Sequence, residues 1–196
     1  MCNLYTLENG PEAIRKIFEA AQIPLTFPEG IPNLEPRNVR ITDRAPIVRI
    51  NRDKGTAELV ERRWSWPAPG GKPVFNMRSD GREFARDRCL VLADGFYEFT
   101  VAADPKQKKK DCWLLRPADG QPFAIAGVTR NAALVGEAFT LLTVPPGRDI
   151  APYHNRQIAL LPPPAWRRWL DGSVSSKEML RPAEAGALSV AAAAVA

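Results

Sequence analysis

The sequence predicts a single α+β domain, in which largely antiparallel, twisted β-sheets form a barrel-like core with a few peripheral helices. The chain of 196 residues contains 19 prolines, and this density of proline disfavours long helices. Between the prolines lie short runs rich in β-branched and aromatic residues, most of them bounded by Gly, Pro or Asp. Neither an internal repeat of about 20–50 residues nor a linker rich in Pro, Gly or Ser divides the chain, which favours one domain.

Three helices are expected around the strands. The first covers Pro11–Gln22, because its leading proline suits the first position of a helix and apolar residues follow at helical spacing. The second covers Pro164–Leu170, which carries two tryptophans on one side. The third is short and covers residues 175–180, because Ser175 followed three residues later by Glu178 is typical of a capping box.

The strand-like runs account for much of the remaining sequence. They are short, and a hairpin turn signal, Asp53-Lys54-Gly55, separates the first two. The expected strands are Ala45–Ile50, Thr56–Trp64, Arg88–Ala93, Tyr97–Thr100, Cys112–Arg116, Phe123–Val128, Phe139–Val144 and Gln157–Leu161.

We expect the domain to cover residues 1–185 and a small-residue tail to cover residues 186–196. The run Ala191–Ala196 is expected to be a frayed end. The lysine-rich run Lys106–Lys110 lies between two predicted strands, and we interpret it as a solvated hairpin tip. A contact with nucleic-acid phosphates is the alternative, since clustered lysines attract them without regard to sequence.

The composition narrows the class of protein. Apolar residues make up 45% and charged residues 25% of the chain, which is typical of a globular fold. The net charge of +5 permits an anionic partner such as nucleic acid without requiring one. No apolar run approaches the roughly 20 residues that span a bilayer, and the N-terminal segment is not typical of a signal peptide. Three cysteines without metal-ligand spacing predict no disulfide framework, no metal site and a cytoplasmic location.

Cys2 is the first candidate for chemistry. A small residue after Met1 favours removal of the initiator methionine, which would leave Cys2 with a free α-amine beside its thiol. The reference pKa values are about 7.7–8.0 for the amine and about 8.5 for the thiol, so both groups are partly nucleophilic near neutral pH. Such an aminothiol attacks an aldehyde twice, first forming a Schiff base and then closing a thiazolidine ring. A small buried residue near a terminus is the alternative interpretation.

Three further residues are candidates on weaker grounds. His154 is the single histidine and precedes a predicted strand in a polar loop, where it either packs or serves as a general acid or base. Glu98 lies between aromatic residues, so its carboxyl is either solvated or partly buried with a raised pKa that suits proton transfer. Asn76 is either a turn residue or an amide that positions a carbonyl group.

Four segments together resemble one family in their order and spacing, the SOS response-associated peptidase (SRAP) family. They are Met1-Cys2, Phe75–Arg78, Asp94–Phe99 and His154–Arg156, and Asp-Gly-Phe-Tyr-Glu is the most specific piece. The resemblance extends from Cys2 to about residue 180. This family includes bacterial and human proteins that shield abasic sites in single-stranded DNA. The resemblance therefore implies that the partner is single-stranded DNA containing abasic sites and that no cofactor is needed, and we expect a monomer.

The resemblance also implies catalytic roles. Cys2 would capture the ring-opened aldehyde of an abasic deoxyribose after loss of Met1, giving a thiazolidine crosslink. Asn76 would position Cys2 and the sugar, and Glu98 would shuttle protons. His154 would hold the sugar oxygen and assist acid–base steps, including crosslink reversal.

DNA-binding roles are implied for four other positions. Arg78 and Arg156 match family arginines that grip the phosphates flanking the lesion. Thr143 matches a position that lines the site, and Asn38 begins the family's Asn-x-x-Pro segment, here with Ile41 in place of the proline. Another departure is Asn3, which begins an Asn-Leu pair where the better-known DNA-crosslinking members have Gly-Arg.

Two other functions remain open at the level of sequence. The same four catalytic residues could attack an amide, which would make the protein an N-terminal-nucleophile cysteine peptidase or an autoprotease. A non-catalytic module that binds single-stranded nucleic acid is the third interpretation, because the departures from the family lie among the DNA-gripping residues.

Overall fold

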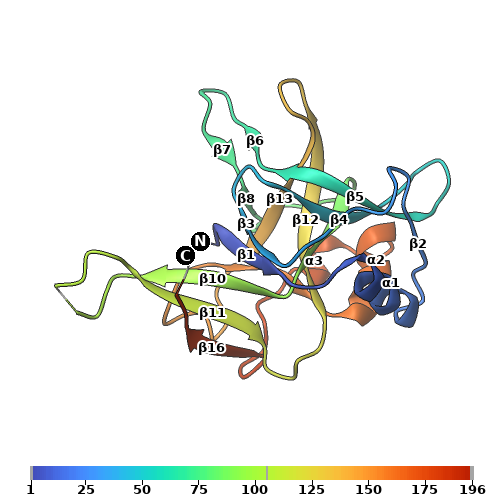
Figure 1. The fold of residues 1–196 in the computed structure, drawn as a ribbon. Helices are drawn as coiled ribbons and strands as arrows, with labels where there is room; N and C mark the ends of the chain where they lie inside the picture. Colours follow the sequence, from blue (N-terminus) through green and yellow to red (C-terminus); the bar gives the residue numbers. More distant parts are fainter. Residues whose placement is uncertain (1, 105, 195–196) are drawn as a thin grey trace.

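The computed structural model describes residues 2–104 and 106–194. Met1, on whose removal the Cys2 hypothesis depends, lies outside them. Across the described residues the strands form a larger sheet, a smaller sheet and a short hairpin (Figure 1). The larger sheet contains β2 (Leu25–Thr26), β4 (Arg44–Ile50), β5 (Ala57–Trp64), β8 (Asn76–Arg78), β9 (Arg88–Ala93), β12 (Phe123–Ala132), β13 (Gly136–Val144), β14 (Gln157–Ile158) and β15 (Leu160–Leu161); the smaller contains β1 (Leu4–Leu7), β3 (Arg37–Arg40), β10 (Gly95–Thr100), β11 (Asp111–Pro117) and β16 (Leu188–Ala192); the hairpin pairs β6 (Trp66–Pro67) with β7 (Pro73–Val74).

Five strands of the larger sheet close on themselves. The pairing runs from β13 through β12, β9 and β4 to β5, each antiparallel to the next. β5 then pairs in parallel with β13, where Trp64 lies opposite Phe139. A closed sheet leaves few free edges and encloses its own core. The expected fold, twisted antiparallel sheets around a barrel-like core, is therefore confirmed.

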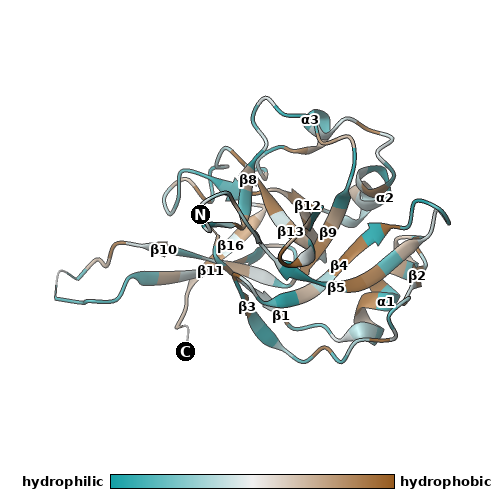
Figure 2. Ribbon diagram, turned by 90° about the horizontal axis from the view of Figure 1, so that it is seen from above, coloured by the Kyte–Doolittle hydropathy of each residue, from teal (hydrophilic) through white to brown (hydrophobic). Residues whose placement is uncertain are grey.

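Apolar side chains and one glycine determine how tightly this barrel closes. Hydrophobic residues gather along β4, β5 and β9, as Figure 2 shows, and all six residues of β9 are buried. Gly127 on β12 faces β9, and a Cβ atom added there would lie only 2.9 Å from Val91 Cγ2 and 3.0 Å from Cys89 Sγ. Only glycine therefore fits at this position of β12, where the strand pairs with β9.

The helices pack on one side of the barrel (Figure 1). α1 (Pro11–Ala20) and α2 (Pro163–Asp171) meet through the rings of Phe18 and Trp166, whose centroids are 4.5 Å apart. Trp169 donates a hydrogen bond to the carbonyl of Cys89 and so ties α2 to the barrel. None of the helices among the described residues is long and apolar enough to cross a membrane.

The third helix, α3 (Ser176–Met179), begins as expected at a serine cap but uses a different carboxylate. The Ser175 hydroxyl accepts a hydrogen bond from the Lys177 amide. The carboxylate that accepts from the Ser176 amide and from both serine hydroxyls belongs to Glu83, which is remote in sequence. These hydrogen bonds lower the pKa of Glu83 to about 2. A capping box with Glu178 is therefore not how the helix start is satisfied.

The smaller sheet differs most from expectation. Its order is β16-β11-β10-β1-β3, and the hairpin between β10 and β11 projects from the body with the exposed Lys106–Lys110 run at its end (Figure 1). The expected frayed end at Ala191–Ala196 is wrong for its first two residues, because Leu188–Ala192 pairs with β11. Small residues suffice there, since β16 is a largely exposed edge strand.

The boundaries of other elements also shift. The expected strand Gln157–Leu161 is split into β14, which pairs with β13, and β15, which pairs with β12. The short strands β1, β3 and β8 were not expected, because each is defined by its neighbours more than by its own composition.

Candidate functional site

Cys2 is buried at the entrance to β1. Its side chain and backbone leave only 1% of the residue exposed. Its Sγ donates to the carbonyl oxygen of Leu4 at 3.3 Å, and its own carbonyl oxygen accepts a hydrogen bond from Asn76 Nδ2 at 2.7 Å. Burial, followed by repulsion from Glu98, raises the pKa of the Cys2 thiol above its ordinary value. The thiol is therefore held protonated.

Strand pairing places the Asn76 amide. β8 runs parallel to β13, with Asn76 opposite Leu141 and Arg78 opposite Thr143. The indole of Trp64 donates to the carbonyl of Phe75 at 2.8 Å, which fixes the residue before the strand. The sequence left open whether Asn76 is a turn residue or a positioning amide, and in the structure it holds the carbonyl of Cys2.

Glu98 is a buried carboxyl in the middle of β10. Only 1% of the residue is exposed, and it lies opposite Trp113 on β11. Burial raises the pKa of Glu98 to about 7. A carboxyl that titrates near neutral pH can both accept and return a proton, which is the property required of a general acid–base group. The interpretation of Glu98 as a buried acid, rather than a solvated one, is confirmed.

The end of β13 gathers the candidate phosphate-binding residues. Arg156 Nη2 donates to the backbone carbonyl of Thr143 at 2.8 Å and approaches Thr143 Oγ1 at 3.3 Å. Ser79, one residue after Arg78, donates to the same carbonyl through its amide and its hydroxyl. β8 and the Arg156 segment thus meet at Thr143. Sequence reasoning missed one member of this cluster, Asp80, whose carboxylate lies 2.6 Å from Arg156.

His154 is attached to the same cluster through the backbone. Its Nδ1 lies 2.9 Å from the amide nitrogen and 3.1 Å from the carbonyl oxygen of Arg156, so the backbone of Arg156 holds the ring whichever nitrogen carries the proton. Burial lowers the pKa of His154, which favours the neutral ring. The preceding residue, Tyr153, packs against Trp113, with ring centroids 5.0 Å apart. Because Trp113 lies opposite Glu98, this contact ties the His154 loop to the strand that carries Glu98.

Asn38 lies elsewhere. It pairs with Thr6 across β3 and β1, and its side chain hydrogen-bonds to the Tyr97 hydroxyl. Tyr97 and Glu98 are neighbours on one strand and point to opposite faces of the sheet. The structure therefore connects Cys2 with Asn76 by a hydrogen bond and with Glu98 by an electrostatic interaction. It joins Arg78, Thr143, Arg156 and His154 around the end of β13 and leaves Asn38 on the other face.

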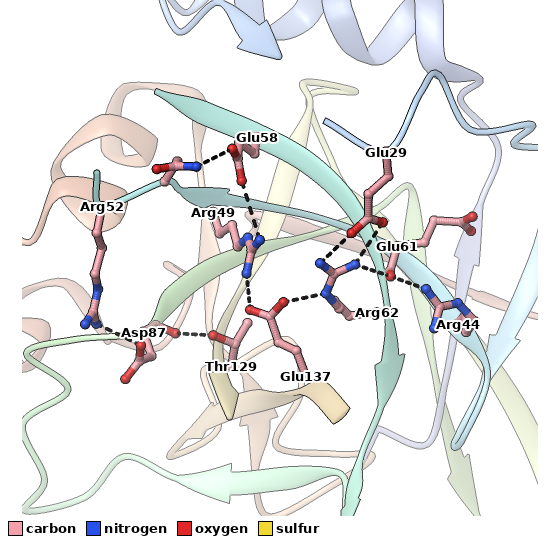
Figure 3. Close-up of polar contacts among 11 residues, drawn as sticks. Glu29, Arg44, Arg49, Arg52, Glu58, Glu61, Arg62, Asp87, Thr129 and Glu137 are labelled. Carbon is pink, nitrogen blue, oxygen red and sulfur yellow. Dashed lines mark hydrogen bonds and ion pairs between the residues drawn. The ribbon is translucent and has the colours of Figure 1, made fainter. Parts of the chain in front are cut away.

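A separate charged cluster lies at the opposite end of β13 (Figure 3). Glu137, near the start of that strand, accepts hydrogen bonds from both Arg49 and Arg62. Arg62 is paired further with Glu29, and Arg49 with Glu58. A cavity of about 740 Å³ borders this network, and its lining includes none of the candidate catalytic residues. The arginines of the charged cluster are paired with carboxylates, which indicates that the cluster has a structural role.

The described residues contain no group of three or more His, Cys, Asp or Glu side chains that could hold a metal ion. The candidate catalytic side chains offer a protonated thiol, a carboxyl that titrates near neutrality and an imidazole whose neutral form is favoured.

Fold and site define the class of protein: a mostly β domain whose first strand carries a cysteine into a buried, hydrogen-bonded site edged by arginines. The sequence profile described as "SOS response associated peptidase (SRAP)" matches residues 1–195. The chain therefore belongs to the SRAP family.

Individual relatives agree with this assignment. The chain is 28% identical over 169 residues to the abasic site processing protein YedK of Escherichia coli strain K12, which covers 74% of each protein. A solved structure from Bordetella bronchiseptica superposes with a TM-score of 0.71 at 22% identity, covering 99% of this chain and 100% of the other. A phage-related protein from the same organism gives 0.73 at 22% identity, covering 98% and 94%. These two structures support the fold.

Proposed function

We propose that this protein captures abasic sites in single-stranded DNA by forming a covalent crosslink through Cys2, and so protects the lesion during the response to DNA damage. Membership of the SRAP family and the likeness to an abasic site processing protein support the substrate class. The single observation that carries the chemistry is the placement of Cys2, held by Asn76 and facing the charge of Glu98.

The reaction begins with hydrolytic removal of Met1, which frees the amine of Cys2. This amine adds to the C1′ aldehyde of the ring-opened sugar, and loss of one water gives a Schiff base. The thiol sulfur then adds to the imine carbon while its proton passes to nitrogen, which closes the thiazolidine ring. No oxidant, metal or cofactor enters this balance.

Glu98 is suited to the proton transfers. The thiol of Cys2 has a raised pKa, so it does not attack as a free thiolate and must lose its proton as it adds. A carboxyl with a pKa of about 7 can take that proton and deliver it to the nitrogen. His154 is held through Nδ1, which leaves Nε2 for the sugar, and Nε2 can donate a hydrogen bond to the sugar oxygen when it carries the ring proton.

The remaining residues would hold the DNA. Arg78 and Arg156 would bind the phosphates on either side of the lesion, and Thr143 would line the site between them. Such contacts predict binding that is salt-dependent and tolerant of sequence. The protein would act as a monomer in the cytoplasm, without a cofactor. Asn38, on the other face of the sheet, would contact DNA only at the margin of this surface.

The test compares three single strands of one sequence: one with an abasic site, one with a tetrahydrofuran analogue that lacks the aldehyde, and one with an intact base. Purified protein is incubated with each, heated in denaturant and separated on a gel. We expect a shifted band with the abasic strand alone. A protein that lacks Met1 and gives no band with any strand would contradict the proposal.

A cysteine peptidase is the second candidate function, since the family is described as a peptidase and the same residues could attack an amide. It predicts turnover of added peptides, visible by mass spectrometry and absent in Cys2→Ala. A non-catalytic binding module instead predicts equal, salt-sensitive binding of intact and abasic strands.

A further inference from the structure

A carboxylate already lies on the arginine that would bind a DNA phosphate. Asp80 Oδ2 is 2.6 Å from Arg156 Nη2, and both Arg156 and Arg78 contribute to lowering the pKa of Asp80. Asp80 is therefore negatively charged at neutral pH and lies in the field of both candidate phosphate-binding arginines.

The two partners differ in their access to water. The side chain of Asp80 is 48% exposed, whereas that of Arg156 is 11% exposed. The carboxylate can rotate into solvent and be hydrated there, but the guanidinium stays buried. The backbone under Asp80 does not need to move, because Ser79 is fixed to the Thr143 carbonyl by two hydrogen bonds.

Arg156 also retains a donor without a partner. Its Nε is buried and makes no hydrogen bond within the described residues, while the contacts of the guanidinium with Thr143 and Asp80 all involve Nη2. A buried donor without an acceptor is costly, and a guanidinium binds phosphate best through two parallel hydrogen bonds. Asp80 gives the guanidinium a single contact, at Nη2, so a phosphate that replaces it there competes with an incomplete pair.

We propose that Asp80 is a built-in competitor for the phosphate site on Arg156, which DNA must displace to bind; the inference rests on the proposed function. In the free protein Asp80 neutralises Arg156. In the complex the phosphate takes its place and the carboxylate turns to water. Asp80 thus lowers the affinity for single-stranded DNA and weakens its dependence on salt.

The opposite role would be to position Arg156, and the contacts argue against it. The carbonyl and the hydroxyl of Thr143 already hold the guanidinium from the protein side. Asp80 contacts it from the side that faces solvent. Removal of the carboxylate therefore makes the guanidinium available to a phosphate, while Thr143 still holds it in place.

The test measures binding of a single strand with intact bases, so that it depends on phosphate contacts and not on chemistry at Cys2. Asp80→Asn is compared with the unchanged protein across a salt series. We expect Asp80→Asn to bind about 2- to 5-fold more tightly, the range of an exposed ion pair. The slope of log K against log salt should steepen by up to about 0.7, the value for one phosphate on a single strand, because no displaced carboxylate then lies near the DNA to offset a neutralised phosphate.

Two controls separate this competition from a general change of charge. Asp53→Asn, in the exposed turn between β4 and β5, removes the same charge away from the site and should change neither quantity. In an Arg156→Gln background, Asp80→Asn should have a much smaller effect, because the contested arginine is gone and only the longer-range attraction of Arg78 remains. If a melting curve shows that Arg156→Gln does not fold, Arg156→Lys replaces it. Asp80→Asn should then raise the affinity for DNA less in the Arg156→Lys protein than in the protein with Arg156.

The outcomes distinguish this inference from the proposed function. Abasic-specific crosslinking together with unchanged or weaker binding by Asp80→Asn would overturn the role of Asp80 alone. An equal gain in the Arg156→Gln background would also overturn it, because the effect would then not act through Arg156. Absence of DNA binding by every variant would overturn both.

Discussion

The amide of Asn76 donates a 2.7 Å hydrogen bond to the carbonyl oxygen of Cys2, across 74 positions of sequence. This contact joins a three-residue strand to the first residues of the chain. It fixes the backbone of Cys2 and therefore the directions of its nitrogen and its thiol. Asn76 is in turn held by the pairing of β8 with β13.

Replacement of Asn76 by Ala removes this restraint. We expect the rate of crosslinking at saturating abasic DNA to fall by roughly 2- to 10-fold, the equivalent of one hydrogen bond of about 0.5–1.5 kcal/mol. Asn76→Asp should be slower still, because a carboxylate accepts hydrogen bonds and repels the carbonyl. Asn131→Ala, in the β12–β13 hairpin, is the matched control. Equal rates for Asn76→Ala and the control would show that the bond does not orient Cys2.

Cys2→Ala should abolish the covalent adduct and leave the affinity for intact single strands within about 2-fold, because the contacts with phosphates are unchanged. Cys112→Ala removes a thiol from β11, on the hairpin that carries Glu98, and should leave the adduct intact. The measurement is the heat-stable band together with a binding titration. An adduct in Cys2→Ala would mean that another group captures the aldehyde.

Glu98→Gln should slow crosslinking and change its pH profile. Because the pKa of Glu98 is about 7, the carboxylate that accepts the proton becomes available as pH rises through that value. The rate of the unchanged protein should therefore rise across pH 6–8, while Glu98→Gln loses the inflection near 7. Any rise in the crosslinking rate that remains in Glu98→Gln reflects deprotonation of the Cys2 amine. Identical profiles would exclude Glu98 as the proton carrier.

The same substitution should stabilise the fold at alkaline pH. Burial raises the pKa of Glu98 above that of the unfolded chain, so the folded state favours the protonated form. Stability is then highest below pH 4.5 with respect to this group and is lost as pH rises through about 7. At pH 8, Glu98→Gln should be more stable by up to about 3 kcal/mol, from a shift of about 2.5 units at 1.36 kcal/mol each. Chemical denaturation at pH 5 and pH 8 measures the difference, and equal stabilities at pH 8 would contradict it.

The charged network at the other end of β13 makes a purely structural prediction. Glu137→Gln leaves Arg49 and Arg62 without their shared carboxylate (Figure 3). We expect the free energy of unfolding to fall by about 2 kcal/mol, since the loss of one partner leaves partly buried charges. Glu61→Gln is the control, because its carboxylate takes no part in the network's ion pairs. Crosslinking by the folded Glu137→Gln protein should be unchanged.

Much of the barrel could be predicted because its strands carry their own signal. The run Arg88–Ala93 is apolar after its first residue, and the structure buries all of it. Glu98 could be singled out for a related reason: a carboxyl among aromatic residues of a strand has little access to water. The pairing that closes β5 onto β13 could not be predicted, because it joins residues 75 positions apart that resemble other strand residues.

The rest of the site depends on contacts between distant segments. β8 is too short to show periodicity, so Asn76 could not be assigned to a strand. Asp80 precedes Gly81, and an Asp-Gly pair in a polar stretch indicates a turn, which the structure contains; its ion pair with Arg156 arises only because β8 and the Arg156 segment meet at Thr143. Asn38 could be matched to a family motif, but its contact with Tyr97 depends on the register of β3 against β1.

Peptide mapping of the crosslink tests the central claim most directly. The adduct formed with an abasic single strand is treated with nuclease and trypsin, and the peptides are sequenced by mass spectrometry. Cleavage after Arg15 gives a peptide that begins at Cys2 if Met1 has been removed. We predict that this peptide carries the deoxyribose on Cys2, with loss of one water, and survives heating. A peptide that retains Met1 and is unmodified, with the sugar on a lysine elsewhere, would contradict the capture of abasic sites by Cys2.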